Sequence, residues 1–189
     1  MGHKRVYQTL EDRNSDLDRL ETNGPYPCRW SNSWLGDGYY FWDTFIENAH
    51  WWGKEVRKYK NGYIICEAIC DFDDTECFDL HGNLEHLQMF RESCDLMKQN
   101  GLVDDQTTVK SVLAFLRNEM KSFNYSAIRV DGLKSKSQYS TFNDILLFES
   151  SKSPHLDLLP AVQICFFEKN SLNLRNYKIV HPHQYGENY

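Results

Sequence analysis

A run of aromatic residues behind two closely spaced glycines is the passage best suited to bind a ligand. Gly36 and Gly38 open directly into four consecutive aromatic residues, 39–42. Glycine there permits a positive φ or a close approach of the backbone, and the aromatic run is typical of a buried strand. Because aromatic residues make up 14% of the chain, we expect some of them to line a pocket for a flat ligand.

A helix is predicted directly after this strand. Thr44 and Glu47 have the spacing of a capping box, in which two side chains satisfy the first backbone N–H groups of a helix. Phe45, Ala49 and Trp52 recur at helical spacing and give this helix an apolar face.

A late strand places one polar residue among apolar neighbours. Alternation within 161–167 directs Val162, Ile164 and Phe166 toward the core. Gln163 is then left on the opposite face, where we expect its side chain to point into a cleft.

Several cysteines and histidines lie close enough in the sequence to suggest zinc ligands. Cys66 and Cys70 are followed by Cys77, His81 and His86. The first two lie in a predicted strand, where residues four apart are about 13 Å apart. Two ligands of one zinc ion each lie about 2.3 Å from it, so this spacing is too wide. We therefore predict buried, reduced thiols and no metal.

Length and composition favour one globular domain over 1–189. The net charge of −6 argues against a dedicated nucleic-acid binder. No apolar run approaches the roughly 18 residues of a membrane span, and the first ten residues lack the apolar core of a secretory signal. We expect a cytoplasmic protein without a membrane partner.

The predicted elements indicate an α+β fold, because strands cluster late and do not alternate regularly with helices. Helices are predicted at about 17–23, 44–52, 83–100 and 107–120, and strands at 5–10, 36–42, 62–72, 126–130, 141–148, 161–167 and 176–180. The sequence lacks the Rossmann, P-loop, α/β-hydrolase and zincin motifs, which excludes sites of those types.

The stretch 36–41, followed by Ala49 and Trp51, resembles the G-x-G-[IV]-Y-F … A-x-Y stretch of ADP-ribosyltransferases of the poly(ADP-ribose) polymerase and diphtheria-toxin type. In that family, the strand tyrosine and the later aromatic residue sandwich the nicotinamide ring of NAD. The resemblance assigns this role to Tyr40 and Trp51, counts Tyr40 as catalytic and places Gly38 at the NAD. Two aromatic faces suit a planar cationic ring.

Two weaker similarities follow in the same order as in the family. Gln8 and Thr9 stand where the family has a first strand of the form Y-[HR]-G-T, which implies that they bind NAD. The stretch 160–169 resembles the late strand S-E-Y-V-V-Y-D that supplies the catalytic glutamate, and Gln163 falls at that glutamate. Ser140 matches the small polar element of the preceding strand.

The resemblance implies a single-domain fold with split, mainly antiparallel sheets around an NAD cleft and helices packed outside. NAD would be the substrate of a glycosyl transfer, with no metal involved. Small stand-alone members of the family suggest a prokaryotic toxin or phage-defence effector that modifies a macromolecular target and has an antitoxin partner.

Gln163 is the main departure from the family pattern. A carboxylate stabilises the oxocarbenium-like state of the ribose, whereas an amide keeps the hydrogen bond and loses the charge, at about 10²- to 10³-fold in rate. Three alternatives follow: a weakened enzyme, a site completed by Glu149 or Glu168, or a silent domain that binds NAD or ADP-ribose. A plain protein-interaction module with an aromatic core is a further alternative.

Overall fold

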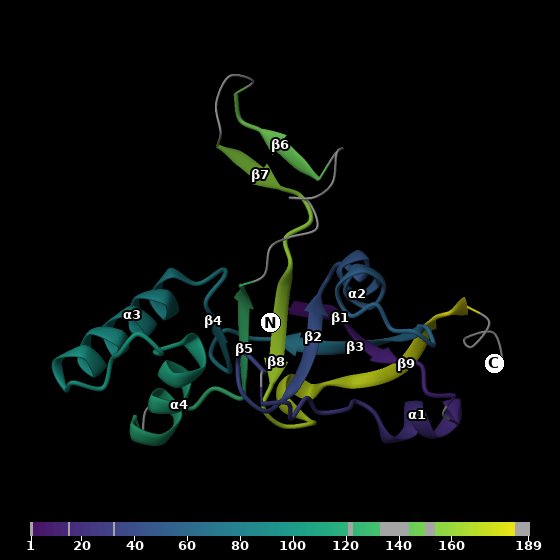
Figure 1. Cartoon of the computed structure of the whole chain (residues 1–189), viewed down its shortest axis with the longest axis horizontal. Coiled ribbons are helices and arrows are strands. Elements are labelled where there is room, and N and C mark those ends of the chain that lie inside the picture. The colour runs from purple at the N-terminus through teal and green to yellow at the C-terminus, as the bar shows by residue number, and fades with distance from the viewer. Residues whose placement is uncertain are drawn as a thin grey trace.

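The computed structural model describes residues 2–14, 16–31, 33–120, 123–132, 144–149 and 154–183 (Figure 1). The strands in these ranges are β1 (Gly2–Glu11), β2 (Tyr39–Asp43), β3 (Tyr63–Phe72), β4 (Cys77–Asp79), β5 (Ala127–Asp131), β6 (Ile145–Leu147), β7 (His155–Asp157), β8 (Val162–Phe166) and β9 (Arg175–His181). The helices are α1 (Leu17–Asn23), α2 (Ile46–Trp51), α3 (Leu84–Gln99) and α4 (Val109–Glu119), with a π-helical turn at Trp52–Val56 and a 3₁₀ turn at Ser171–Asn173.

Seven strands form one sheet in the order β4-β5-β8-β2-β1-β3-β9. Every neighbouring pair is antiparallel except β4 and β5. The α+β class and the mainly antiparallel sheet agree with the sequence-based prediction, although hydrogen bonds join all seven strands into a single layer.

The sheet is nearly divided between β1 and β2. These strands pair at only two positions, Val6 with Asp43 and Tyr7 with Trp42. Strands β2, β5 and β8 run in a different direction from β3 and β9 (Figure 1). The end of β1 therefore stays with β3 while the start of β2 stays with β8, and the two halves of the sheet splay apart.

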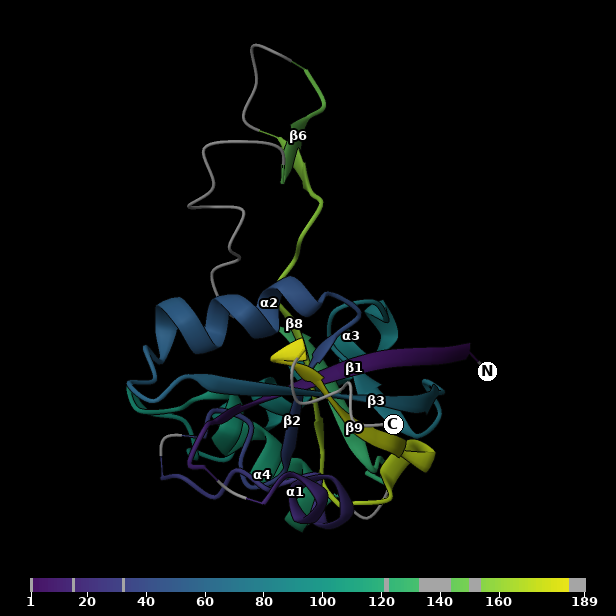
Figure 2. The same ribbon diagram turned by 90° about the vertical axis from the view of Figure 1, so that its right-hand side faces the viewer.

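Separate apolar clusters attach the helices to this sheet. Helix α2 packs through Ala49 on Tyr7 and Trp42, and α4 packs through Leu113 on Ile128 of β5. Helix α1 lies on the other side of the strands from α2 (Figure 2) and contacts β3 and β9 through a cluster that contains Leu20, Ile64, Cys66 and Ile179.

Residues at the helix ends explain two predicted helices and correct a third. Asn83 accepts hydrogen bonds from the first backbone N–H groups of α3, and Thr108 caps α4. The capping box predicted from Thr44 and Glu47 is wrong: α2 begins after Phe45, which makes no side-chain cap. The Thr44 hydroxyl instead donates to Asp43 at 2.8 Å, and Thr44 has a left-handed φ of 64°.

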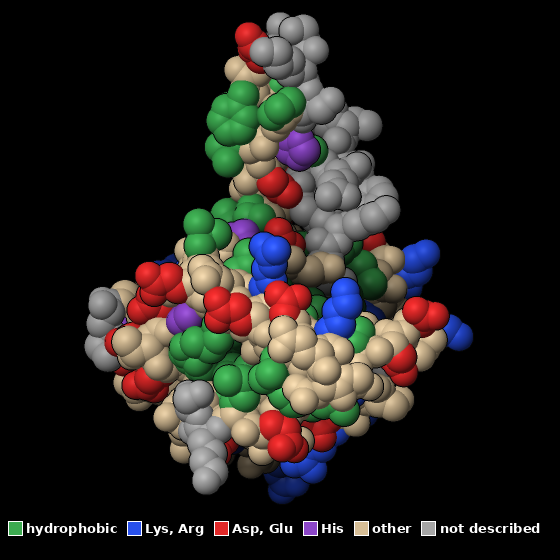
Figure 3. Space-filling view, turned by 90° about the vertical axis from the view of Figure 1, so that its left-hand side faces the viewer, with side chains coloured by type: hydrophobic (Ala, Val, Ile, Leu, Met, Phe, Trp, Pro, Cys, Tyr) green, Lys and Arg blue, Asp and Glu red, His purple; other side chains and the backbone are tan. Residues whose placement is uncertain are grey.

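A small hairpin of β6 and β7 projects from the body of the protein (Figures 1 and 2). Exposed apolar side chains gather along it (Figure 3) and include Leu146, Leu147 and Phe148. The predicted strand 141–148 is shorter here, because β6 covers Ile145–Leu147 and 141–143 lie outside the described residues.

The two edge strands of the large sheet, β4 and β9, differ in length and in what covers their free backbone groups. Strand β4 has three residues. At the other end, the backbone N–H of Ile179 in β9 donates a 2.5 Å hydrogen bond to the carboxylate of Glu21 in α1.

Among the described residues, no helix combines the length and the apolar character that crossing a membrane requires.

Candidate functional site

A cavity of about 860 Å³ opens where β1 and β2 diverge. Residues of the two splayed strands, of α1, of β8, of the loops before α1 and before β2 and of the segment after α2 surround it. They are Gln8, Thr9, Leu10, Glu11, Arg13, Leu20, Tyr26, Pro27, Cys28, Trp30, Ser33, Trp34, Tyr40, Trp42, Trp52, Arg57, Lys58, Tyr59, Lys60 and Gln163. Gln8, Thr9, Tyr40 and Gln163, which the sequence singled out, therefore lie around one cavity.

Aromatic rings form much of the cavity wall. Trp42 and Tyr40 come from β2, and the rings of Trp42 and Trp52 lie 5.7 Å apart between centroids. Trp34 adds a third indole from the loop before β2. Such a wall suits a flat ligand, because ring faces and edges can pack against it.

Cationic residues gather at the same cavity. Arg13, Arg57, Lys58 and Lys60 line it, whereas Glu11 is the one acidic residue among the described lining residues. The Glu11 carboxylate accepts a hydrogen bond from Arg13 at 3.0 Å. This excess of positive charge favours an anionic ligand.

Arg57 also stabilises the rim of the cavity. Its guanidinium lies 4.1 Å from the ring centroid of Trp30 and 5.6 Å from that of Tyr59. The contact with Trp30 connects the segment after α2 to the loop before β2, whereas Tyr59 belongs to the same segment as Arg57. The two walls of the cavity are thereby held next to each other.

Gln163 lines the cavity from β8, although both faces of that strand are buried. Its side-chain oxygen accepts a 3.1 Å hydrogen bond from the indole nitrogen of Trp34, and the residue is only 5% exposed. An indole N–H can only donate, so the amide oxygen must face Trp34. No described group accepts a hydrogen bond from the Gln163 amide nitrogen, which leaves both of its N–H groups for a ligand.

The side-chain amide of Gln8 forms hydrogen bonds that join β1 to the loop before β2 and to β9. Its oxygen accepts from the Tyr26 backbone N–H at 3.0 Å and from the Tyr177 hydroxyl at 2.8 Å. Its nitrogen donates to the Tyr26 carbonyl at 2.8 Å. No described group accepts a hydrogen bond from its second N–H, so Gln8 can offer a ligand a single hydrogen bond. The neighbouring Thr9 hydroxyl donates to the Ala49 carbonyl at 2.9 Å and connects β1 to α2.

Tyr40 presents its ring to the cavity, but its hydroxyl is already engaged. The hydroxyl donates to the Gly36 carbonyl at 2.7 Å and accepts from the Leu35 N–H at 3.0 Å. Burial, with a smaller contribution from Cys165, raises the pKa of Tyr40 far above its ordinary value. Tyr40 can therefore stack on a ligand, and its hydroxyl holds the loop before β2 instead of transferring protons.

Gly38 is required by strand packing. A Cβ atom at this position would lie 2.5 Å from the Cys165 sulfur and 2.7 Å from the Phe166 carbonyl oxygen. The glycine therefore lets β2 approach β8 closely, and Gly38 is not among the described lining residues.

Trp51 does not join Tyr40 at the cavity. It packs edge-on against Trp42, with 6.1 Å between ring centroids, and its neighbour Trp52 lines the cavity instead. The predicted pairing of Tyr40 with Trp51 around a ring is therefore not what the structure shows. Ser140 lies outside the described residues.

The two glutamates that could replace a carboxylate at position 163 do not line this cavity. Neither Glu149, beyond the end of β6, nor Glu168, beyond the end of β8, is among the described lining residues. No carboxylate other than that of Glu11 lines the cavity within the described ranges.

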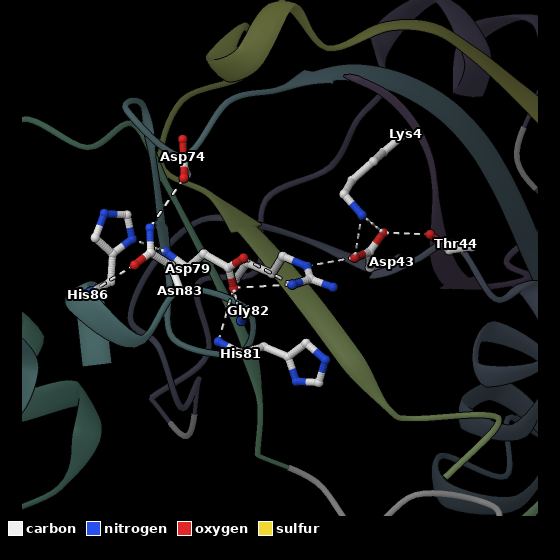
Figure 4. A network of polar contacts seen from close by, with 10 residues as sticks. Lys4, Asp43, Thr44, Asp74, Asp79, His81, Gly82, Asn83 and His86 are labelled. Atoms are coloured by element: carbon white, nitrogen blue, oxygen red, sulfur yellow. Dashed lines mark hydrogen bonds and ion pairs between the residues drawn. The ribbon is translucent and has the colours of Figure 1, made fainter. Parts of the chain in front are cut away.

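A buried ionic network joins four strands of the sheet (Figure 4), and no sequence motif predicts it. Arg129 of β5 contacts Asp43 of β2 at 2.7 Å and Asp79 of β4 at 3.1 Å, and Lys4 of β1 contacts Asp43 at 3.2 Å. Burial disfavours ionised Asp43, but the charges of Arg129 and Lys4 outweigh burial and lower its pKa. The network ties β1 and β2, two strands that line the cavity, to β4 and β5.

The two cysteines of β3 are buried in the protein. Cys66 and Cys70 are buried in β3, and burial raises the pKa of each thiol to about 12. Within the described ranges, no three His, Cys, Asp or Glu side chains are grouped so that they could hold a metal ion.

Comparison with known proteins adds one partial relative. An uncharacterized protein of Methanocaldococcus jannaschii is 37% identical over 84 residues, which cover 42% of this chain and 38% of that protein. The match thus spans well under half of the relative's length. No family model matches the chain, and no solved structure matches it.

Proposed function

We propose that this cavity binds NAD and that the protein is an ADP-ribosyltransferase. The observation that carries the proposal is the combination, in one cavity, of a tryptophan-rich wall with an excess of Arg and Lys. NAD carries a flat cationic nicotinamide ring, a flat adenine and an anionic pyrophosphate between two riboses. Its parts match the two kinds of lining residue.

The fit has a physical basis for each part of the ligand. Trp52, Tyr40 and Trp34 line the cavity with partly exposed aromatic side chains, which can pack on a planar group. Arg57 and Lys58 offer donors and charge to a pyrophosphate. The volume of about 860 Å³ also lies in the range usual for small-molecule sites.

The proposed chemistry breaks the bond between the nicotinamide nitrogen and the ribose carbon, and the ribose then joins a nucleophile of the target. Positive charge develops on the ribose, and a nearby anion would stabilise it. Gln163 offers N–H donors and no charge, so we propose slow turnover. The target would be a macromolecule, as expected for a toxin or phage-defence effector with an antitoxin partner.

A second candidate is a domain of the same fold that holds NAD or ADP-ribose without cleaving it. A specific observation favours it: the one described carboxylate at the cavity, that of Glu11, is already paired with Arg13.

Two measurements on the purified protein test these proposals. NAD at about 100 times its Kd should add about 2.7 kcal/mol to the free energy of unfolding and raise the melting temperature. A nicotinamide-release assay then separates the enzyme from the binding domain. If NAD does not raise the melting temperature, the proposal is wrong and an interaction module becomes the better explanation.

A further inference from the structure

The positive charge of the cavity exceeds what NAD requires. The described lining residues carry four positive charges, on two arginines and two lysines, and one negative charge, on Glu11. Acidic residues outnumber basic ones in the whole chain, 27 to 21, so the cavity is opposite in sign to the chain. NAD has one net negative charge, because its pyrophosphate is doubly negative and its nicotinamide ring is cationic. The cavity therefore matches a ligand with about two more negative charges than NAD.

Two of the lining cations, Arg13 and Lys60, come from segments that lie side by side. Arg13 follows the end of β1, and Lys60 precedes the start of β3. The Asp12 backbone N–H donates to the Gly62 carbonyl at 3.1 Å and holds these segments together. Two cations on adjoining segments can contact the same phosphate group.

This end of the cavity lies away from Gln163. Gln163 of β8 pairs with Trp42 of β2, which in turn pairs with Tyr7 of β1. From Tyr7, β1 runs on to Glu11, a distance of about 13 Å, before the chain reaches Arg13. A dinucleotide whose nicotinamide half lies at Gln163 can therefore place its adenosine half at the adjoining cations.

Both side chains can receive a ligand. Lys60 is exposed, and within the described ranges no carboxylate pairs with it. Arg13 is paired with Glu11 through its Nε atom at 3.0 Å, but 71% of the arginine side chain is exposed. Its terminal guanidinium N–H groups therefore remain for a phosphate.

Building on the proposed function, we propose that Arg13 and Lys60 form a subsite for a phosphate on the adenosine ribose, so that the cavity takes NADP in preference to NAD. A phosphate monoester, like that of a phosphorylated serine, carries about 1.5 to 2 negative charges at pH 7, which matches the excess charge of the cavity. Arginine can present two N–H groups to this phosphate, and lysine adds a point charge. Arg57 and Lys58 remain for the pyrophosphate that both dinucleotides share.

The test compares two subsite variants, Arg13→Gln and Lys60→Gln, with two charge-matched controls, Arg19→Gln and Lys98→Gln. All four remove one positive charge, but Arg19 and Lys98 are exposed residues that are not among the described lining residues. Arg19 is also ion-paired with a nearby carboxylate, as Arg13 is. Titration calorimetry gives the Kd of each protein for NAD and NADP, and thermal melting verifies that each variant folds.

We expect the wild type to bind NADP about 10-fold more tightly than NAD, the scale of an added charge-assisted contact. Each subsite variant should weaken NADP about 3- to 10-fold and change the Kd for NAD by less than about 2-fold. NAD has no phosphate to lose contact with these two side chains. The two controls should leave both Kd values unchanged.

Two further measurements attribute the preference to the phosphate and its charge. ADP-ribose and its 2′-phosphate should show the same ratio of Kd values as NAD and NADP, because both lack nicotinamide and differ only in that phosphate. Raising the salt concentration from about 0.05 M to about 0.5 M should reduce the preference for NADP, because salt screens exposed charges.

The subsite is overturned if the wild type binds NAD and NADP equally well, or if the subsite variants weaken both dinucleotides to the same degree. It is also overturned if the charge-matched controls reduce the preference for NADP as much as the subsite variants do, since the preference would then come from the overall charge of the chain. The proposed function would survive each of these results. If the wild type binds neither dinucleotide, the proposed function fails and the subsite fails with it.

Discussion

The indole nitrogen of Trp34 donates a 3.1 Å hydrogen bond to the side-chain oxygen of Gln163 and so links the loop before β2 to strand β8. The indole nitrogen can donate a hydrogen bond but cannot accept one, which fixes the orientation of the Gln163 amide. A carboxylate at position 163 could accept the same hydrogen bond with one oxygen and present the other to a ligand.

Gln163→Glu should raise the rate of NAD cleavage by up to about 10²- to 10³-fold, because the carboxylate would offset the charge that develops on the ribose. A nicotinamide-release assay at equal protein concentrations measures the change. Gln106→Glu is the control, since Gln106 is exposed and is not a lining residue. An unchanged rate in Gln163→Glu would place the stabilising group elsewhere.

Trp52→Ala and Trp51→Ala should separate binding from stability. Trp52 lines the cavity, so its loss should weaken NAD by about 1–3 kcal/mol, the scale of a lost stacking partner. Trp51 packs on Trp42, so its loss should lower the melting temperature and leave the Kd nearly unchanged. Calorimetry and thermal melting on both variants check this, and the opposite pattern would restore Trp51 as the ligand contact.

Asp43→Asn should reduce stability in a pH-dependent way. Burial works against ionised Asp43, but Arg129 and Lys4 lower its folded-state pKa below the ordinary 3.8. This stabilisation is therefore present above about pH 4 and is lost as the pH falls through the folded-state pKa. The variant should be about 3 kcal/mol less stable at pH 7, as when a buried pair is broken, and the gap should narrow in acid.

Urea unfolding of wild type and Asp43→Asn between pH 7 and pH 3 measures this gap. Asp16→Asn serves as the control, because the Asp16–Arg19 pair lies on the surface with 57% and 82% of the two side chains exposed. Such pairs contribute less than about 1 kcal/mol. A gap that stays constant across the pH range would mean that the charge of Asp43 is not the stabilising feature.

Gly38→Ala should destabilise the protein by about 1–3 kcal/mol, the usual result of overpacking. The added methyl group would collide with Cys165 and the Phe166 carbonyl and push β2 away from β8. Gly2→Ala is the matched control, because nothing lies within 4 Å of a Cβ atom there. Equal melting temperatures for the two variants would contradict the close strand approach.

Elements with strong local signals were predictable from the sequence. Helix α3 combines apolar residues at helical spacing with Asn83 at its start and Gly101, with a φ of 68°, just past its end. Strands β4 and β7 have three residues each, which is too short for an alternating apolar and polar pattern to be detected in the sequence. Their positions depend on pairing with distant strands, and local sequence does not report such pairing.

The cavity was predictable only in part. Strand alternation singled out Gln163, which lines the cavity, and helical periodicity grouped Trp52 with Ala49, whereas the family similarity selected Trp51. The backbone widens into a π-helical turn at Trp52–Val56, so a uniform helical period does not fix which indole faces the cavity. The basic character of the site was missed because Arg13 and Arg57 belong to separate segments that only the fold brings together.

The hydrogen bond from Ile179 to Glu21 affects how readily the edge of the sheet could pair with another molecule. An open sheet ends in strands whose free N–H and C=O groups can recruit a strand from another molecule. In β9, the Glu21 carboxylate takes up one of these N–H groups, and α1 stands where an incoming strand would pair. At the opposite end, β4 offers only three residues as a template. Neither edge of the sheet therefore offers a long strand with free hydrogen-bonding groups to which a strand of another molecule could pair.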